Sequence, residues 1–158
     1  MDFIIRVDDR LIHGQITAGW VRPLGIERIV LANDAVANDT WQKEIYAMSV
    51  PTEIEVKIFV VNEAVGFLKN LNDKKKTMVV INSLQDALAI IKAGIRPLKL
   101  NIGGLHFEPG KKSFATYIFL SDDDIKQAKE ILKSGVTLEG REIPGSPAIN
   151  LDNLIRQS

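Results

Sequence analysis

Two arginines, two carboxylates and one histidine lie close together near the N-terminus, within the segment Arg6-Val7-Asp8-Asp9-Arg10-Leu11-Ile12-His13-Gly14-Gln15. An imidazole has an unperturbed pKa of ~6.5, so near neutral pH it is largely uncharged and can attack phosphorus as a nucleophile. A phosphoryl group needs donors for its oxygens, and the guanidinium of Arg10 lies three residues before His13. The segment therefore predicts a loop in which His13 holds a phosphoryl group.

The other residues of this loop have more than one use. Asp8 or Asp9 could accept a hydrogen bond from the second ring nitrogen of His13 and so fix its tautomer, or could hold Arg10 in place. Gly14 lets the backbone approach closely before a helix that we expect over residues 15–21. A histidine near a helix start is also commonly a cap or a packed polar residue, and the residue types alone leave that interpretation open.

Short apolar runs alternate with helix-patterned stretches along the chain, which predicts an α/β fold. The candidate strands cover residues 3–7, 28–32, 56–61, 77–81 and 98–102. Several are continuous apolar runs of the kind found in parallel sheets that are covered on both faces. Two weaker runs, 114–119 and 136–143, fit an edge strand or an antiparallel one. Ligands of open α/β sheets bind beyond the carboxyl ends of the strands, where the loop after strand 3–7 lies.

Three helices have recognisable ends. Asn62 is a cap for a helix running to residue 71, and Ser83 is a cap for a helix over 84–93. Ser121 begins a third helix, with acidic residues in its first turn and Gly135 at its end.

The two tryptophans fit the interior of the protein. Trp41 is spaced at helical intervals from Ile45 and Met48, so we expect these three side chains in the core. Trp20 follows His13 by seven residues and is interpreted as core or as part of a docking surface.

Composition narrows the class of protein. The chain has 158 residues, which fits one domain over 1–158, and its formal net charge is zero, which gives no reason to expect nucleic acid as a partner. It has no cysteine and only two histidines, His13 and His106, without metal-ligand spacing, so no metal site is predicted. No leader and no membrane span is expected, because Met1–Arg6 lacks a basic region before a long apolar run.

The loop sequence Arg-Val-Asp-Asp-Arg-Leu-Ile-His-Gly-Gln closely resembles the phosphorylation-site signature of one protein family. Its members are the IIB subunits of the mannose/fructose/sorbose branch of the bacterial phosphoenolpyruvate-dependent sugar phosphotransferase system. The resemblance continues through Asn33-Asp34-Ala35-Val36-Ala37-Asn38-Asp39 and Asn101-Ile102-Gly103-Gly104. It extends to a closing pattern with Val136 and Pro144, where Ile143 replaces the usual valine.

This resemblance implies an open, mostly parallel sheet of about seven strands, with helices on both faces and room for one antiparallel edge strand. It implies a phosphotransferase without a cofactor, in the cytoplasm and peripherally associated with the inner face of the membrane. Its histidine takes a phosphoryl group from a IIA phosphohistidine and passes it to a sugar during uptake through IIC and IID. A homodimer, the sugar and the ring nitrogen that is phosphorylated are left open.

Residue by residue, the resemblance makes His13 the phosphohistidine, with Arg10 steadying the phosphoryl oxygens and Asp8 orienting the loop. Arg6 and Asp9 match the signature without an assigned role. The residues expected to border the site are Gly14, Asn33, Asp34, Gly103 and Gly104.

The sequence allows two other interpretations. The main rival is a non-catalytic regulatory module on the same α/β scaffold, in which His13 and Arg10 bind an anion or another small ligand. A nucleotide phosphate loop over 104–113 is disfavoured, because five residues separate its glycines and a strand-like run follows. The role of His106 stays open.

Overall fold

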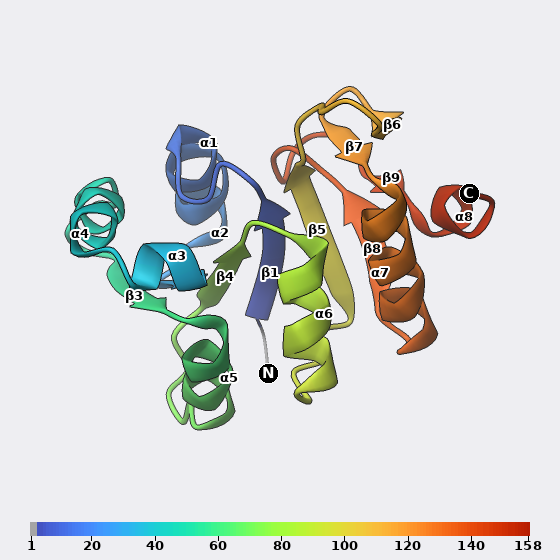
Figure 1. The fold of residues 1–158 in the computed structure, drawn as a ribbon. Helices are drawn as coiled ribbons and strands as arrows, with labels where there is room; N and C mark the ends of the chain where they lie inside the picture. Colours follow the sequence, from blue (N-terminus) through green and yellow to red (C-terminus); the bar gives the residue numbers. More distant parts are fainter. Residues whose placement is uncertain (1–2) are drawn as a thin grey trace.

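The computed structural model describes residues 3–158, so Met1 and Asp2 of the segment considered for a leader lie outside it. Seven strands form one sheet in the order β3-β2-β4-β1-β5-β8-β9 (Figure 1). Their bounds are β1 Phe3–Asp8, β2 Arg28–Ala32, β3 Glu55–Phe59, β4 Thr77–Ile81, β5 Lys99–Gly104, β8 Thr137–Gly140 and β9 Ile149–Asn150. The first six strands of the order are parallel, and β9 pairs antiparallel with β8 at one edge. The predicted α/β class and its antiparallel edge strand are confirmed.

The helices are short and follow the strands in the chain. Their bounds are α1 Gly14–Ile16, η1 Thr17–Val21, α2 Arg22–Leu24, α3 Asp34–Ala37, α4 Thr40–Met48, α5 Val61–Lys69, α6 Leu84–Lys92, α7 Asp122–Lys133 and α8 Asp152–Arg156. No helix within residues 3–158 is both long and apolar enough to cross a bilayer.

Strand β1 occupies the position where the chain changes direction across the sheet. The chain leaves β1 toward β2 on one side, and later returns to place β4 and β5 on either side of β1. In open α/β sheets this arrangement opens a crevice at the carboxyl end of the central strand. The loop after β1 starts at that crevice.

The two faces of the sheet have separate apolar cores. One core joins alternate strand residues such as Ile5, Val7 and Val79 to the helices α5, α6, α7 and α8. The other joins Met78 and Val80 to the segment α1–α2 on the opposite side (Figure 1). Because side chains alternate across a strand, Arg6 and Asp8 point to the second face, toward the helices that follow the loop.

The last two predicted strands differ from the structure. Residues 114–119 do not form one strand but two, β6 Lys112–Ala115 and β7 Ile118–Leu120, which pair as a separate antiparallel hairpin. The turn at residues 116–117 interrupts the apolar run, so alternation alone misled the prediction. The run 136–143 is strand only over β8, which is an interior parallel strand because β9, which the sequence did not predict, covers its outer edge.

Two of the predicted helices begin as expected. Ser83 caps α6 and Ser121 caps α7, where Asp124 completes a capping box. Helix α5 begins two residues earlier than predicted, with Val60 as its N-cap, and Asn62 lies inside it. The helix expected over 15–21 is a short α-helical turn followed by the π-helix η1, a rare form that occurs often near functional sites.

The prediction that Trp41 lies in the core is wrong. Its side chain is 71% exposed, that of Met48 is 84% exposed, and Ile45 is also exposed. The helical spacing correctly placed the three residues on one face of α4. No residue of α4 is buried, since no other part of residues 3–158 covers this face. Trp20, by contrast, is buried in the second core.

Candidate active site

Backbone hydrogen bonds hold the first part of the loop that carries His13. The Asp9 amide donates to the Gly104 carbonyl at 3.0 Å, and the Leu11 amide donates to the Asp8 carbonyl at 2.9 Å. Leu11 has a φ of 59°, a conformation that costs a non-glycine residue energy and persists only where surroundings hold it. Its buried side chain in the second core supplies that hold. The loop is therefore a fixed turn from which both Arg10 and His13 contact Asp8.

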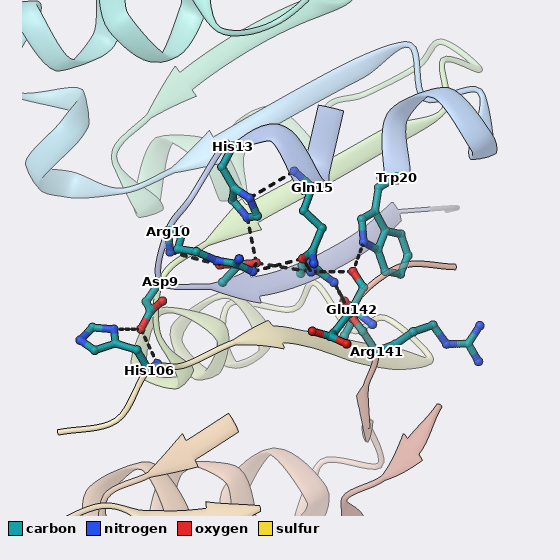
Figure 2. Close-up of polar contacts among 11 residues, drawn as sticks. Asp9, Arg10, His13, Gln15, Trp20, His106, Arg141 and Glu142 are labelled. Atoms are coloured by element: carbon teal, nitrogen blue, oxygen red, sulfur yellow. Dashed lines mark hydrogen bonds and ion pairs between the residues drawn. The ribbon is translucent and has the colours of Figure 1, made fainter. Parts of the chain in front are cut away.

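His13 is the N-cap of α1, and both of its ring nitrogens have partners (Figure 2). Nδ1 accepts a hydrogen bond from the Gln15 backbone amide at 3.3 Å. Nε2 lies 3.1 Å from Oδ2 of Asp8. An amide can only donate and a carboxylate can only accept, so the neutral ring carries its proton on Nε2 and an electron pair on Nδ1. The cap and the nucleophile interpretations of His13 describe the same geometry.

Asp8 is the buried anion of the site. Its carboxylate receives Nε and Nη2 of Arg10, both at 2.9 Å, in a two-pronged contact. The Arg10 amide also donates to Asp8 at 3.1 Å. Burial by itself would raise the pKa of Asp8, but the hydrogen bonds from His13 and Arg10 outweigh it and lower the pKa to about 2. Asp8 is therefore ionised at any physiological pH.

Arg6 lies beneath the loop and is fully buried. Nη1 donates to the Asn101 side chain and to the Arg141 carbonyl at 2.8 Å, and Nη2 donates to the Glu142 carbonyl at 3.0 Å. Burial lowers the pKa of Arg6 to about 10, and the nearby Asp8 opposes that shift, so the guanidinium stays charged at neutral pH. With Arg10 it gives two guanidinium groups in contact with the one carboxylate of Asp8.

Gln15 connects the two arginines, a role that the sequence analysis missed. Its Oε1 accepts from Nη2 of Arg6 at 2.7 Å and from Nη2 of Arg10 at 3.1 Å (Figure 2). The sequence signal for this role is that Gln15 belongs to the loop signature, two residues after His13. One amide oxygen therefore fixes the spacing of the two guanidinium groups.

Trp20 closes the buried side of the site. The Arg6 guanidinium lies 4.8 Å from the centre of the Trp20 ring, which is within the range of a cation–π contact. Trp20 Nε1 donates to the Glu142 carbonyl at 2.7 Å (Figure 2). Glu142 acts through its backbone, so its side-chain type gave the sequence analysis no signal.

The two glycines at the end of β5 are placed beside the arginines. The strand pairing shifts register at this point, so that Asp8 pairs with Gly104 and Gly103 has no partner on β1. A Cβ on Gly103 would lie 1.9 Å from the Arg6 guanidinium carbon, and a Cβ on Gly104 would lie 3.1 Å from Arg10 Nη2. Both positions thus leave room for a guanidinium, whereas Gly14 has open space around it.

Asp9 faces away from His13 and holds the segment after β5. Its Oδ2 accepts from the His106 backbone amide at 2.8 Å and also contacts the His106 ring (Figure 2). His106 is exposed and lines a cavity together with Asp9 and Arg10. No group of three or more potential metal-ligating side chains occurs in the described part of the chain.

Asn33 and Asp34 have structural partners at the end of β2. Asn33 caps α3 by accepting from the Val36 amide, and Asp34 accepts from the Val61 amide at 2.8 Å. These bonds join β2 to the starts of α3 and α5. In residues 3–158 neither side chain is hydrogen-bonded to the loop that carries His13.

Comparison with known proteins identifies the class to which this fold and loop belong. The family model described as "PTS system sorbose subfamily IIB component" matches residues 3–158. The sorbose-specific EIIB component of Klebsiella pneumoniae is 31% identical over 156 residues, covering 98% of this chain and 95% of that protein. The crystal structure of the IIBSor domain of the sorbose permease from the same organism superposes with a TM-score of 0.90 at 30% identity, covering 100% and 98% of the two chains.

A longer relative has the same segment within a larger chain. The mannose-specific EIIAB component of Escherichia coli K12 is 26% identical over 153 residues, covering 96% of this chain but 47% of that protein. The chain belongs to the sorbose subfamily of IIB components of the phosphotransferase system. It is a IIB phosphotransferase component that transfers phosphoryl groups in sugar uptake, and this membership implies IIA, IIC and IID partners.

Proposed function

We propose that His13 is the phosphoryl carrier of this IIB component and that Nδ1 is the atom that bonds to phosphorus. The observation that carries the proposal is the pair of contacts made by the ring. The buried Asp8 holds Nε2–H, which leaves the electron pair of Nδ1 on the side of the Gln15 amide. After transfer, the same Asp8 carboxylate neutralises the positive charge that the phosphorylated ring acquires.

In this proposal Arg10 and the Gln15 amide receive the phosphoryl oxygens. The Arg10 side chain is half exposed, and none of the hydrogen bonds in residues 3–158 uses its Nη1. Asp8 and Gln15 hold its other nitrogens, so the guanidinium is oriented before the phosphoryl group arrives. As the N–P bond forms, the hydrogen bond that the Gln15 backbone amide donates to Nδ1 can shift to a phosphoryl oxygen.

The transfer then has two steps. Nδ1 attacks the phosphorus of a IIA phosphohistidine, whose P–N bond breaks and returns its electron pair to the donor ring. A sugar hydroxyl oxygen next attacks the phosphorus on His13, the hydroxyl proton passes to solvent, and the electron pair of that P–N bond returns to Nδ1. Both steps depend on position and charge, which is what phosphoryl transfer mainly demands of a protein.

The partners in this scheme are a IIA subunit or domain as donor, and the IIC and IID membrane subunits that present the sugar. Residues 1–158 act as one IIB domain in the cytoplasm, peripherally at the inner face of the membrane. The sugar is not assigned, because relatives that share the segment are named for sorbose and for mannose.

A phosphorylation assay separates this proposal from an anion-binding regulatory module. The protein is incubated with phosphoenolpyruvate, the general phosphocarrier proteins and a cognate IIA, and intact mass is measured before and after acid treatment. We expect an acid-labile gain of one phosphoryl group, lost in His13→Ala and kept in His106→Ala. A folded wild-type protein that gains no phosphoryl group from several IIA partners would favour the regulatory module.

A further inference from the structure

A second cavity lies behind the site, on the far side of the contact between Arg6 and Trp20. Its volume is about 370 Å³, within the range of sites for small organic ligands. It runs from Trp20 and Leu24 along the sheet to the segment before β5, where Pro97 and Leu98 line it. His13 is at the carboxyl end of β1, whereas this cavity reaches Phe3 and Ile4 at the other end of the same strand.

One buried polar group on the wall of the cavity lacks a partner. Asn101 is only 4% exposed, and its Oδ1 accepts a hydrogen bond from Nη1 of Arg6. Its Nδ2, on the opposite arm of the amide, has no hydrogen-bond partner among residues 3–158. Buried donors are nearly always satisfied, so an unsatisfied one beside a cavity indicates a missing acceptor.

A second donor in the same wall is also unsatisfied. Arg141 donates Nη1 to the Pro144 carbonyl at 2.9 Å and Nη2 to Glu139 at 3.3 Å, but its Nε has no partner among the described residues. Asn101 and Glu139 pair across β5 and β8, which brings the wall residues of the two strands side by side. Both free groups are donors, and neither is an acceptor.

The charged side chains around the cavity are mainly positive. Arg96, Lys99 and Arg141 line it, against the single carboxylate of Glu139. Glu139 already contacts Lys99 at 3.2 Å and Arg141 at 3.3 Å, so it does not neutralise Arg96. The rest of the lining is apolar and includes the Trp20 ring and the exposed Leu98.

We infer that this cavity binds a small organic anion, with its carboxylate or phosphate oxygens toward Asn101 and Arg141 and its apolar body against Trp20 and Leu98. An oxyanion supplies acceptors for the two unsatisfied donors and balances the excess cations. An apolar body buries the apolar lining of the cavity, which an inorganic ion cannot do. The size of the cavity favours a metabolite over a protein segment.

The inferred site shares Trp20, Asn101 and Arg141 with the scaffold of the active site. Nη1 of Arg6 donates both to the Asn101 side chain and to the Arg141 carbonyl. A ligand held by the other polar atoms of these residues therefore lies one contact away from Arg6, which in turn contacts Asp8 at 3.4 Å. The two sites remain distinct, because no residue of the loop 9–15 lines the cavity.

The test uses the purified full chain and two side-chain signals in ¹H–¹⁵N NMR spectra, the Nδ2 amide of Asn101 and the indole Nε1–H of Trp20. The probes are benzoate, phenyl phosphate, inorganic phosphate and benzyl alcohol. We expect saturable shifts of both signals with benzoate or phenyl phosphate at concentrations up to about 10 mM, and affinities at least about tenfold weaker for inorganic phosphate and for benzyl alcohol. Benzoate and phenyl phosphate distinguish a carboxylate from a phosphate ligand.

Two charge-reversed variants localise the effect. Arg96→Glu changes the exposed rim of the cavity and should weaken binding at least about tenfold. Lys126→Glu makes the same change of charge on exposed α7 and should leave the affinity unaltered. The inference is overturned if no organic anion gives saturable shifts, if both variants bind as the wild type does, or if inorganic phosphate binds as well as the organic anions. Backbone amide dispersion in the same spectra checks that each variant is folded.

Discussion

The carboxylate of Asp8 lies 3.1 Å from Nε2 of His13, and it is completely buried while the imidazole is partly exposed. The anion is thus fixed from inside the protein, and the ring that it orients faces solvent and an incoming partner. Because Arg10 and Arg6 also contact Asp8, one carboxylate sets the position of the nucleophile and of the two cations around it. Substitutions at Arg10, Asp8 and Gln15 separate these contributions.

Replacing Arg10 by lysine keeps the positive charge but removes the planar fork. The two contacts of 2.9 Å to Asp8 cannot both form, and the cation no longer has a fixed direction. We expect phosphoryl transfer from IIA to slow on the order of tenfold to hundredfold. The measurement is the single-turnover rate with phosphorylated IIA, together with a urea unfolding curve. Equal transfer rates for Arg10→Lys and the wild type would refute the assigned role of Arg10.

The protein should lose stability in acid through Asp8. The folded pKa of this group, about 2, is below its ordinary value of 3.8, so its contribution is present above pH 3.8 and is lost as the pH falls through about 2. The difference between the two pKa values corresponds to about 2 kcal/mol of unfolding free energy. Urea unfolding at a series of pH values measures it.

Asp8→Asn is the comparison for that experiment. It removes the titrating group but leaves the buried Arg6 without its carboxylate, so at neutral pH we expect a loss of about 3 kcal/mol or more. Its stability should then fall less steeply than that of the wild type below pH ~4. Parallel pH profiles for the two proteins would show that the Asp8 pKa is not depressed by folding.

Gly103→Ala should strain the contact between β5 and Arg6. The added Cβ would lie 1.9 Å from the Arg6 guanidinium carbon, so the buried arginine must move away from its acceptors. We expect a loss of about 3 kcal/mol in unfolding free energy, at the upper end of the range for overpacking. Gly14→Ala is the matched control, because its Cβ meets open space, and its stability should change by less than about 1 kcal/mol. Similar stabilities for the two variants would exclude close packing at Gly103.

Two substitutions of Gln15 test whether its oxygen spaces the arginines. Gln15→Leu removes the shared acceptor of Arg6 and Arg10, so both stability, by about 1–3 kcal/mol, and transfer rate should fall. Gln15→Glu keeps an acceptor but adds a negative charge near the phosphoryl site, so stability should be retained while transfer slows. Urea unfolding midpoints and single-turnover transfer rates distinguish the two variants. Unchanged transfer in both variants would leave Gln15 without a function in the site.

The sequence predicted the parts of the fold that depend on local rules. The apolar runs marked β1, β2, β3, β4 and β5, and the caps at Ser83 and Ser121 marked two helices, because strands and caps are encoded by neighbouring residues. Trp41 shows the limit of such rules. Helical spacing identifies a face, but whether anything covers it depends on the arrangement of the whole chain.

The same distinction holds for the site. His13, Arg10 and Asp8 are close in the sequence, and both His13 and Arg10 contact the Asp8 carboxylate. The alternatives left open for Asp8 and Asp9 are resolved by the geometry, since Asp8 contacts both His13 and Arg10 while Asp9 contacts His106. Three partners of Arg6 come from more than ninety residues away, and two of these are backbone carbonyls, which no side-chain pattern reveals.

The most direct test of the central claim is the identification of the phosphorylated atom. The protein is labelled with ¹⁵N, phosphorylated through IIA, and its histidine ring nitrogens are assigned from long-range ¹H–¹⁵N correlations. The account predicts phosphorus on Nδ1 of His13, with Nε2 still protonated beside Asp8. Phosphorus on Nε2 of His13, or on His106, would contradict it.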